Sequence, residues 1–249
     1  LEPSERDVYL TSLEANFDVG FATLTSSTAY YNNEGNITSE NTGFYAQNGW
    51  LGAWYYNYPR PMATAYREFG DEAFTQELRL VSNPGEKFDY IVGAFYIDQN
   101  RLSTQDSYLV GLSQWAQAAG MPWITTDQDY HYRQEVQFTE IAVYGQLTWH
   151  ATSTLDFTGG LRYFDDTTKT NGEQAIPIWG IGPDYSQGKE SDSKVLFMVN
   201  MSWQFTDNNQ LYTTISEGYR RGGTNGVPTL GFFAENPVWN SYEPDTVTN

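Results

Sequence analysis

The sequence predicts an all-β fold, an antiparallel meander of eight or nine strands that forms part of a large transmembrane β-barrel. Apolar and polar side chains alternate in segment after segment, which is typical of strands that have two different faces. Short connections alternate with long ones along the chain, and aromatic residues make up 16% of the 249 residues. No run of about 18 apolar residues occurs, so a transmembrane helix is not expected.

The alternation is clearest in three segments, Val136–Trp149, Leu155–Asp165 and Val195–Trp203. Trp149 and Trp203 each end an apolar face just before a short turn, where the aromatic girdle of a membrane barrel would lie. The apolar face expected to contact lipid comprises Ile141, Val143, Leu147, Trp149, Phe157, Leu161, Phe197, Val199 and Trp203. Further strands are expected at about Val8–Phe17, Phe21–Tyr31, Phe74–Val81, Phe88–Ile97 and Leu211–Tyr219, with a ninth beginning near Thr246.

The connections alternate strictly between short and long. Gly, Asn, Asp and Pro fill the short ones, as tight hairpins require. Outer-membrane barrels have short periplasmic turns and long extracellular loops, and this explains the alternation directly. The short connections are Asp18–Gly20, Asn83–Lys87, Ala151–Thr154 and Thr206–Asn209. The long ones are roughly Asn32–Ala73, Gln99–Glu135 (which contains one helix-like stretch, Ser113–Ala119), Thr167–Ser191 and Arg220–Ser241.

Composition and charge argue against several functions. A net charge of −18 disfavours nucleic acid, whose binding needs a basic surface. There is no cysteine, and His131 and His150 lie far apart without helical H-x-x-x-H spacing, so no metal site or cofactor is expected. No G-x-S-x-G elbow or placeable acid–base pair is present, so no catalytic residue is expected and the chain is not expected to be an enzyme.

Five segments together resemble the barrel of TonB-dependent receptors, the outer-membrane family of siderophore and nutrient receptors. They occur in the family's order over most of the chain, although each is weak alone. They are Phe74–Leu80, Phe88–Tyr96, the hairpin Ile141–Gln146 with Thr158–Tyr163, Leu211–Gly223, and Tyr242–Asn249.

The resemblance implies active import of a scarce nutrient, by default a ferric siderophore or another iron complex, across the outer membrane of a bacterium. The family has a plug domain, a segment that contacts the TonB complex, and a barrel of about 22 strands. Residues 1–249 are therefore expected to be one partial barrel domain without a plug. Its partners would be outer-membrane lipid, the plug, the TonB complex through that region, and a small-molecule ligand. The charged residues expected to face the lumen and the plug are Glu77, Arg79, Asp156 and Arg162.

Aromatic residues are frequent in two of the long connections. Exposed aromatic side chains on loops indicate either contact with a ligand or packing among the loops themselves. Both interpretations stay open for this set. The ligand-binding candidates are Trp50, Trp54, Tyr55, Tyr56, Arg60, Trp115 and Trp123.

Two other functions fit parts of the pattern. A passive porin would share the barrel but would have no plug upstream. A soluble carbohydrate-binding β-sandwich would explain the acidity and the exposed aromatic residues, but its apolar faces would be buried against a second sheet.

Overall fold

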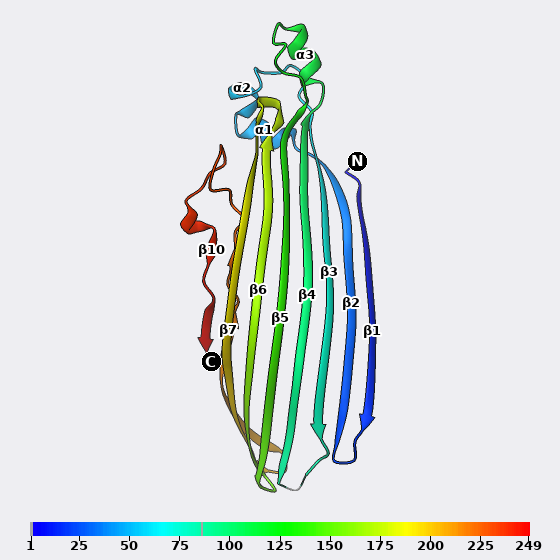
Figure 1. Ribbon diagram of the computed structural model, residues 1–249, viewed down its shortest axis with the longest axis vertical. Helices are drawn as coiled ribbons and strands as arrows, with labels where there is room; N and C mark the ends of the chain where they lie inside the picture. The colour runs from blue at the N-terminus through cyan, green and yellow to red at the C-terminus, as the bar shows by residue number, and fades with distance from the viewer. Residues whose placement is uncertain (1, 86) are drawn as a thin grey trace.

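The computed structural model describes residues 2–85 and 87–249; Leu1 and Glu86, the latter in the expected turn Asn83–Lys87, lie outside the described residues. The described chain forms one antiparallel sheet of nine strands in the order β1-β2-β3-β4-β5-β6-β7-β8-β11, and each of the first eight strands pairs with the next along the chain (Figure 1). The strands are β1 (Ser4–Asp18), β2 (Ala22–Glu40), β3 (Ala63–Ser82), β4 (Phe88–Leu109), β5 (Gln128–Thr152), β6 (Leu155–Ile176), β7 (Ile181–Thr206), β8 (Asn209–Arg220) and β11 (Asp245–Thr248).

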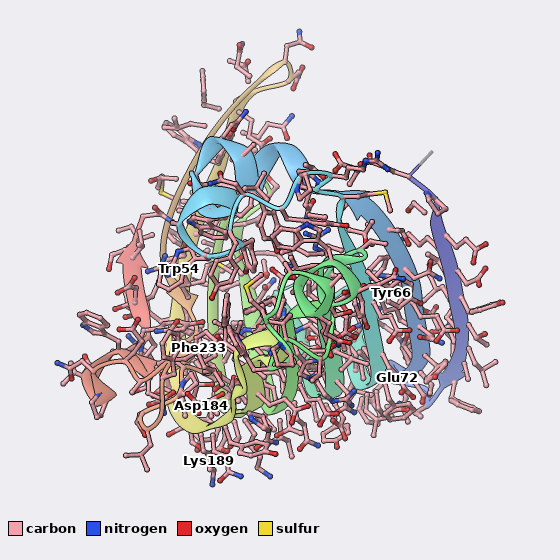
Figure 2. The ribbon with its side chains drawn as sticks, turned by 90° about the horizontal axis from the view of Figure 1, so that it is seen from above. Trp54, Tyr66, Glu72, Asp184, Lys189 and Phe233 are labelled. Atoms are coloured by element: carbon pink, nitrogen blue, oxygen red, sulfur yellow. The ribbon has the colours of Figure 1, made fainter. Side chains whose placement is uncertain are left out.

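The sheet curves into an open arc, and the short helices lie within the arc when it is viewed along the strands (Figure 2). None of the described helices is long and apolar enough to cross a membrane. A two-stranded pair, β9 with β10, lies in the connection between β8 and β11. The remaining elements are α1 (Thr42–Gln47), α2 (Trp50–Ala53), α3 (Leu112–Ala118), η1 (Pro177–Trp179), β9 (Gly223–Thr224), η2 (Pro237–Trp239) and β10 (Ser241–Tyr242).

The expected meander is confirmed, and each predicted strand lies within or closely overlaps an observed one. The helix-like stretch is confirmed as α3. The short turns gather at one end of the sheet, opposite the helices (Figure 1). In the first turn Gly20 has a φ of 91°, and its N–H donates to Asp18 Oδ1 over 2.7 Å, which is the local chemistry of a tight hairpin.

Three of the four long connections are shorter than predicted. The strands continue well into three of these regions. The sequence did not reveal this, because the halves of the strands nearer the helices carry polar side chains on both faces and so show no apolar alternation. The connection expected at Thr167–Ser191 is the clearest correction. There β6 and β7 form a long hairpin joined only by η1 and Gly180, whose φ of 64° reverses the chain.

One face of the sheet carries an apolar band. Residues opposite each other on neighbouring antiparallel strands share a face, and the register pairs Tyr96 with Ile141, Val143 with Tyr163, and Leu161 with Phe197. The side chains of this band are open to the surroundings, with Ile141 58% and Leu161 61% exposed, and no second sheet covers them within the described chain. That arrangement is not a β-sandwich.

Aromatic side chains lie at both ends of the apolar band. Near the short turns lie Phe88, Trp149, Phe157 and Trp203, and at the other end lie Phe74, Tyr96 and Tyr163. From Phe88 to Tyr96 the band runs roughly 26 Å along β4 at about 3.3 Å per residue. With a strand tilt of about 40° the band is roughly 20 Å tall, close to the apolar belt of outer-membrane barrels.

The longest strands extend far beyond this band. Strands β3 to β7 have 20 to 26 residues, whereas a membrane crossing takes about 9–11. The strands therefore build a wall that continues past the apolar band toward α1, α2 and α3 (Figure 1).

Close packing on the other face predicts a sensitivity at Gly93 in β4. A Cβ at Gly93 would lie 2.5 Å from the Tyr144 ring and 2.9 Å from the Leu78 carbonyl oxygen, so we expect Gly93→Ala to destabilise the barrel by about 1–3 kcal/mol. Gly159→Ala is the matched control, because nothing lies within 4 Å of a Cβ there. The measurement is denaturant unfolding of the protein in lipid vesicles, and equal midpoints for the two variants would contradict this packing.

Candidate functional site

A cavity of about 540 Å³ lies where the wall meets α1 and α2. Its wall comes from the ends of β3, β4 and β5, and its cover from the connection between β2 and β3. Phe233, from the connection between β8 and β11, also contributes to the lining. Half of the twelve lining side chains are aromatic and five of the others are polar or charged: Asn41, Phe44, Tyr45, Trp50, Tyr55, Arg67, Gln105, Ser107, Asp129, Tyr130, Ile176 and Phe233.

A β-bulge places the carboxylate of this cavity. The register between β4 and β5 pairs Ser107 with Tyr130 and Tyr108 with Gln128, which leaves Asp129 without a cross-strand partner. An extra residue of this kind turns a side chain out of the regular alternation. Asp129 and the next residue, Tyr130, consequently both line the cavity.

Two tyrosines hold Asp129. The hydroxyls of Tyr45 and Tyr55 both donate to Asp129 Oδ2, the second over 3.3 Å. All three residues are buried, with exposed fractions of 5%, 6% and 4% for Tyr45, Tyr55 and Asp129. The contact therefore joins the helical cover to the wall.

Burial dominates the electrostatics of this group. Removal from water raises the pKa of Asp129, and the two tyrosine hydroxyls offset that rise only in part. Burial and the neighbouring carboxylate also raise the pKa of Tyr45 and of Tyr55, so both remain hydrogen-bond donors at neutral pH.

The cover is fixed by polar contacts and by local backbone conformation. The Ala63 N–H donates to Thr42 Oγ1 over 2.8 Å, and the Thr42 N–H donates to Glu40 Oε1 over 2.7 Å. After α2, Tyr56 and Asn57 adopt φ angles of 54° and 51°. Non-glycine residues rarely adopt this conformation, and such positions concentrate at functional sites.

Edge-to-face aromatic packing completes the cover. The ring of Trp50 meets Phe44 at 5.1 Å and Tyr45 at 5.6 Å between centroids, both nearly perpendicular. Tyr55 stacks on Trp179 of η1 at 6.2 Å. Pairs of this geometry stabilise by about 0.5–1.5 kcal/mol beyond the area they bury.

The structure separates the seven aromatic and basic candidates into groups. Trp50 and Tyr55 line the cavity. Tyr56 lies 6.1 Å from Trp179, and Trp115 packs against Tyr58 beside a buried cluster around α3. The remaining three are exposed and lie outside the lining: Trp54, Arg60 and Trp123.

Sequence reasoning missed most of the lining. Phe44 and Tyr45 adjoin the aromatic stretch and could have been found by extending it. Asp129 depends on a bulge that no periodicity reveals, and Phe233 comes from a segment about 100 residues away in sequence. Phe233 is held by its own backbone N–H, which donates to Asp184 Oδ2 over 2.9 Å (Figure 2).

The face opposite the apolar band is polar and internally paired. Tyr144 donates its hydroxyl to Glu77, and the Arg162 guanidinium pairs with Glu140 over 2.5 Å. Asp156 accepts from His150 Nδ1 over 2.8 Å. The four charged residues expected in the lumen all lie on this face: Glu77, Arg79, Asp156 and Arg162.

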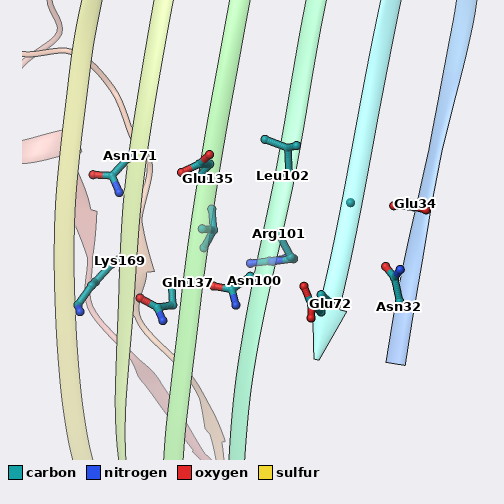
Figure 3. A pocket seen from close by; sticks show the side chains of 12 residues that line it. Asn32, Glu34, Glu72, Asn100, Arg101, Leu102, Glu135, Gln137, Lys169 and Asn171 are labelled. Atoms are coloured by element: carbon teal, nitrogen blue, oxygen red, sulfur yellow. The ribbon is translucent and has the colours of Figure 1, made fainter. Parts of the chain in front are cut away.

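A second, polar cavity of about 490 Å³ lies beyond the apolar band, across β2 to β6 (Figure 3). Glu34 and Glu72 lie at one side of it and Lys169 at the other, with Arg101, Glu135 and asparagine and glutamine side chains between them. This composition indicates that the face of the sheet that carries the apolar band becomes solvated directly beyond Phe74, Tyr96 and Tyr163, the aromatic residues at the end of the band.

His131 connects three strands on that outer wall. Its Nδ1 lies 2.7 Å from Asp106 Oδ1 and its Nε2 lies 3.0 Å from Glu173 Oε1, so β4, β5 and β6 are tied together. Burial lowers the pKa of His131, but the hydrogen bonds to the two carboxylates outweigh burial and the net shift is upward.

The family is established by a match to the family model described as TonB dependent receptor-like, beta-barrel, over residues 3–246. The chain belongs to this family of TonB-dependent receptors. Family members are receptors and transporters in the outer membrane of Gram-negative bacteria rather than enzymes, and that membrane is the location of this chain. The resemblance inferred from the sequence is thereby confirmed.

Individual relatives match over part of their length. The pesticin receptors of Yersinia enterocolitica and Yersinia pestis are 36% and 35% identical over 96 residues, which is 38% of this chain and 14% of theirs. The ferric yersiniabactin uptake receptor FyuA from Yersinia pestis superposes with a TM-score of 0.73 at 18% identity, over 99% of this chain and 33% of its own. The ferric-catecholate import receptor Fiu of E. coli K12 gives 0.56 at 12% identity, over 88% and 33%.

The His131 contacts predict that the stability of the polar part of the wall, between the apolar band and the helices, depends on pH. Because the pKa of the folded-state imidazole is raised, its stabilisation is complete below about pH 6.5 and is lost as pH rises through the folded-state pKa. Hydrogen exchange of the residues around Asp106, His131 and Glu173 in the full-length receptor, corrected for intrinsic rates, should show greater protection at pH 5.5 than at pH 8.5. We expect His131→Gln to abolish that difference. His150→Gln is the control at the opposite end of the strands, and a difference that survives His131→Gln would refute the assignment.

Proposed function

We propose that this chain forms part of the barrel wall and of the extracellular mouth of an outer-membrane receptor that imports a ferric siderophore. The observation that carries the proposal is the aromatic cavity around Asp129, at the end of the strands opposite the short turns. Concave sites lined by aromatic rings with a few polar groups are typical of small-molecule binding. Two solved structures that share this fold are described as the ferric yersiniabactin uptake receptor and the ferric-catecholate import receptor.

Transport against a gradient needs an energy source that a barrel wall does not supply. We assign that role to a plug domain of the same protein and to the TonB complex that acts on it. The polar face with Glu77, Arg79, Asp156 and Arg162 would contact the plug. Internal pairs such as Arg162 with Glu140 suit this role, because they keep a wet interface satisfied without fixing a tight one.

The apolar band would contact the lipid. Its alternating side chains supply a continuous apolar surface between the aromatic side chains at its two ends, and β4 to β7 pair strand to strand through it. The nine lipid-facing candidates all lie on this face: Ile141, Val143, Leu147, Trp149, Phe157, Leu161, Phe197, Val199 and Trp203.

If the apolar band contacts lipid, an added charged side chain should destabilise the protein within the band but not in the polar part of the wall between the band and the helices. We expect Leu161→Arg to destabilise the full-length receptor in lipid vesicles by about 2–4 kcal/mol, because an arginine near the midplane of the bilayer is costly. Leu102→Arg, on the same face but within the polar wall, should change stability by less than about 1 kcal/mol. Equal losses in urea unfolding would argue against a lipid-embedded band.

The cavity predicts a difference between two loop tryptophans. Trp50 lines the cavity, whereas Trp123 is 61% exposed and lies outside it. We expect Trp50→Ala to weaken binding of the ligand by about tenfold and Trp123→Ala to leave it unchanged. The probe is ferric yersiniabactin, with a ferric catecholate complex as the second ligand, titrated into the full-length receptor in detergent.

Uptake in cells separates active import from passive diffusion. Cells that produce the full-length receptor should accumulate iron from one of these complexes, and deletion of TonB should abolish the accumulation. Uptake that survives the deletion would indicate a passive channel. Binding of neither ferric complex would remove the siderophore assignment.

A further inference from the structure

One carboxylate oxygen of Asp129 has no hydrogen-bond donor beside it. Its Oδ2 accepts from both tyrosine hydroxyls, while its Oδ1 is buried and has no hydrogen-bond partner among the residues that the structure describes. The residue is only 4% exposed and lies in the cavity lining. A buried acceptor without a donor is rare in folded proteins and calls for a specific explanation.

Three other polar side chains of the lining, Arg67, Gln105 and Ser107, are hydrogen-bonded. Arg67 Nε donates to Gln105 Oε1 over 2.8 Å and its Nη1 donates to Ser39 Oγ over 2.6 Å, while Gln105 Nε2 donates to Ser107 Oγ over 3.0 Å. Within the described lining, Asp129 Oδ1 is the buried side-chain acceptor left open.

The rest of the lining sets the shape and charge of what can bind. Phe44, Tyr45, Trp50, Tyr55 and Phe233 present aromatic rings, which favour a planar partner. The lining holds one cationic side chain, Arg67, and one carboxylate, Asp129, so its formal charges cancel and it favours a neutral group over an ion. The cavity is within the usual range of small-molecule sites.

We propose that this cavity is a subsite for a neutral, planar ring group of the imported ligand, and that the group donates one O–H or N–H hydrogen bond to Asp129 Oδ1. The inference rests on the proposed function, since it names which part of a ligand the mouth recognises. It also explains why a buried carboxylate is retained beneath an aromatic cover: a site built for a donor discriminates strongly against analogues that lack one.

Three fluorinated probes test the chemistry without knowledge of the full ligand. They are 4-fluorophenol, which is neutral and donates, 4-fluoroanisole, which is neutral and cannot donate, and 4-fluorobenzoate, which is an anion. Binding to the full-length receptor in detergent is followed by fluorine NMR. We expect 4-fluorophenol to bind about tenfold more tightly than 4-fluoroanisole, and the benzoate to bind more weakly than either.

Asp129→Asn tests the residue. The amide oxygen can still accept from Tyr45 and Tyr55, but the amide nitrogen replaces the open acceptor with a donor, so the preference for the phenol should fall below about twofold. Asp127→Asn is the matched control. Its carboxylate accepts from the N–H groups of Gly111 and Ser113 at the start of α3 and lies outside the lining, so the preference should remain.

Several outcomes overturn the inference. They are failure of both neutral probes to bind, equal affinity of phenol and anisole for the unsubstituted receptor, and an unchanged preference in Asp129→Asn. The first two need no variant, so they hold even if the variant misfolds. Ferric yersiniabactin and ferric catecholate uptake by the same receptor is measured separately. Uptake without phenol preference defeats this inference alone, whereas phenol preference without uptake defeats the proposed function alone.

Discussion

The pairing of backbone hydrogen bonds between neighbouring strands is the constraint on which the rest of the structure depends. Hydrocarbon offers no partner for an N–H or C=O group, so a chain that crosses it as strands must satisfy them from strand to strand. Here each of the first eight strands pairs with its neighbour along the chain, in near-continuous register. That register in turn decides which side chains share a face, because a slip of one residue would exchange the two faces.

The same continuous pairing explains how one set of strands serves two environments. Within the apolar band, between its two groups of aromatic side chains, the outer face is apolar, as at Leu161. The inner face carries pairs such as Arg162 with Glu140. Beyond the end of the band nearer the helices, the strand pairing continues but the side chains on the outer face become polar, as at Glu135 and Lys169. The rigid wall thus reaches the cavity, and a single bulge at its end suffices to turn Asp129 toward Tyr45 and Tyr55.

The sequence predicted the strands wherever a strand has one apolar and one polar face, as at Ile141 to Trp149. It did not predict the halves of β6 and β7 nearer η1, because polar side chains fill both faces there, including buried ones such as Thr170 and Ser186, and a polar strand has the composition of a loop. Within the site, composition identified the aromatic stretch but could not distinguish Tyr55, which is buried against Asp129, from Trp54 beside it, which is exposed. That distinction arises from contacts between segments far apart in the sequence, such as α2, β5 and η1.

The central claim is that one sheet presents alternate side chains to lipid and to a polar interior within the band, and to water on its outer face beyond it. Residues 1–249 contain no cysteine. Once any cysteine elsewhere in the full-length receptor is replaced by serine, single cysteines introduced along β6 can each carry a nitroxide spin label. In lipid vesicles, accessibility to dissolved oxygen should peak at Phe157, Gly159, Leu161 and Tyr163 and fall at the residues between them. From Thr167 to Asn171 the oxygen maxima should give way to accessibility to a water-soluble nickel complex. An alternation that is absent, or that peaks at Arg162 instead of Leu161, would contradict the account.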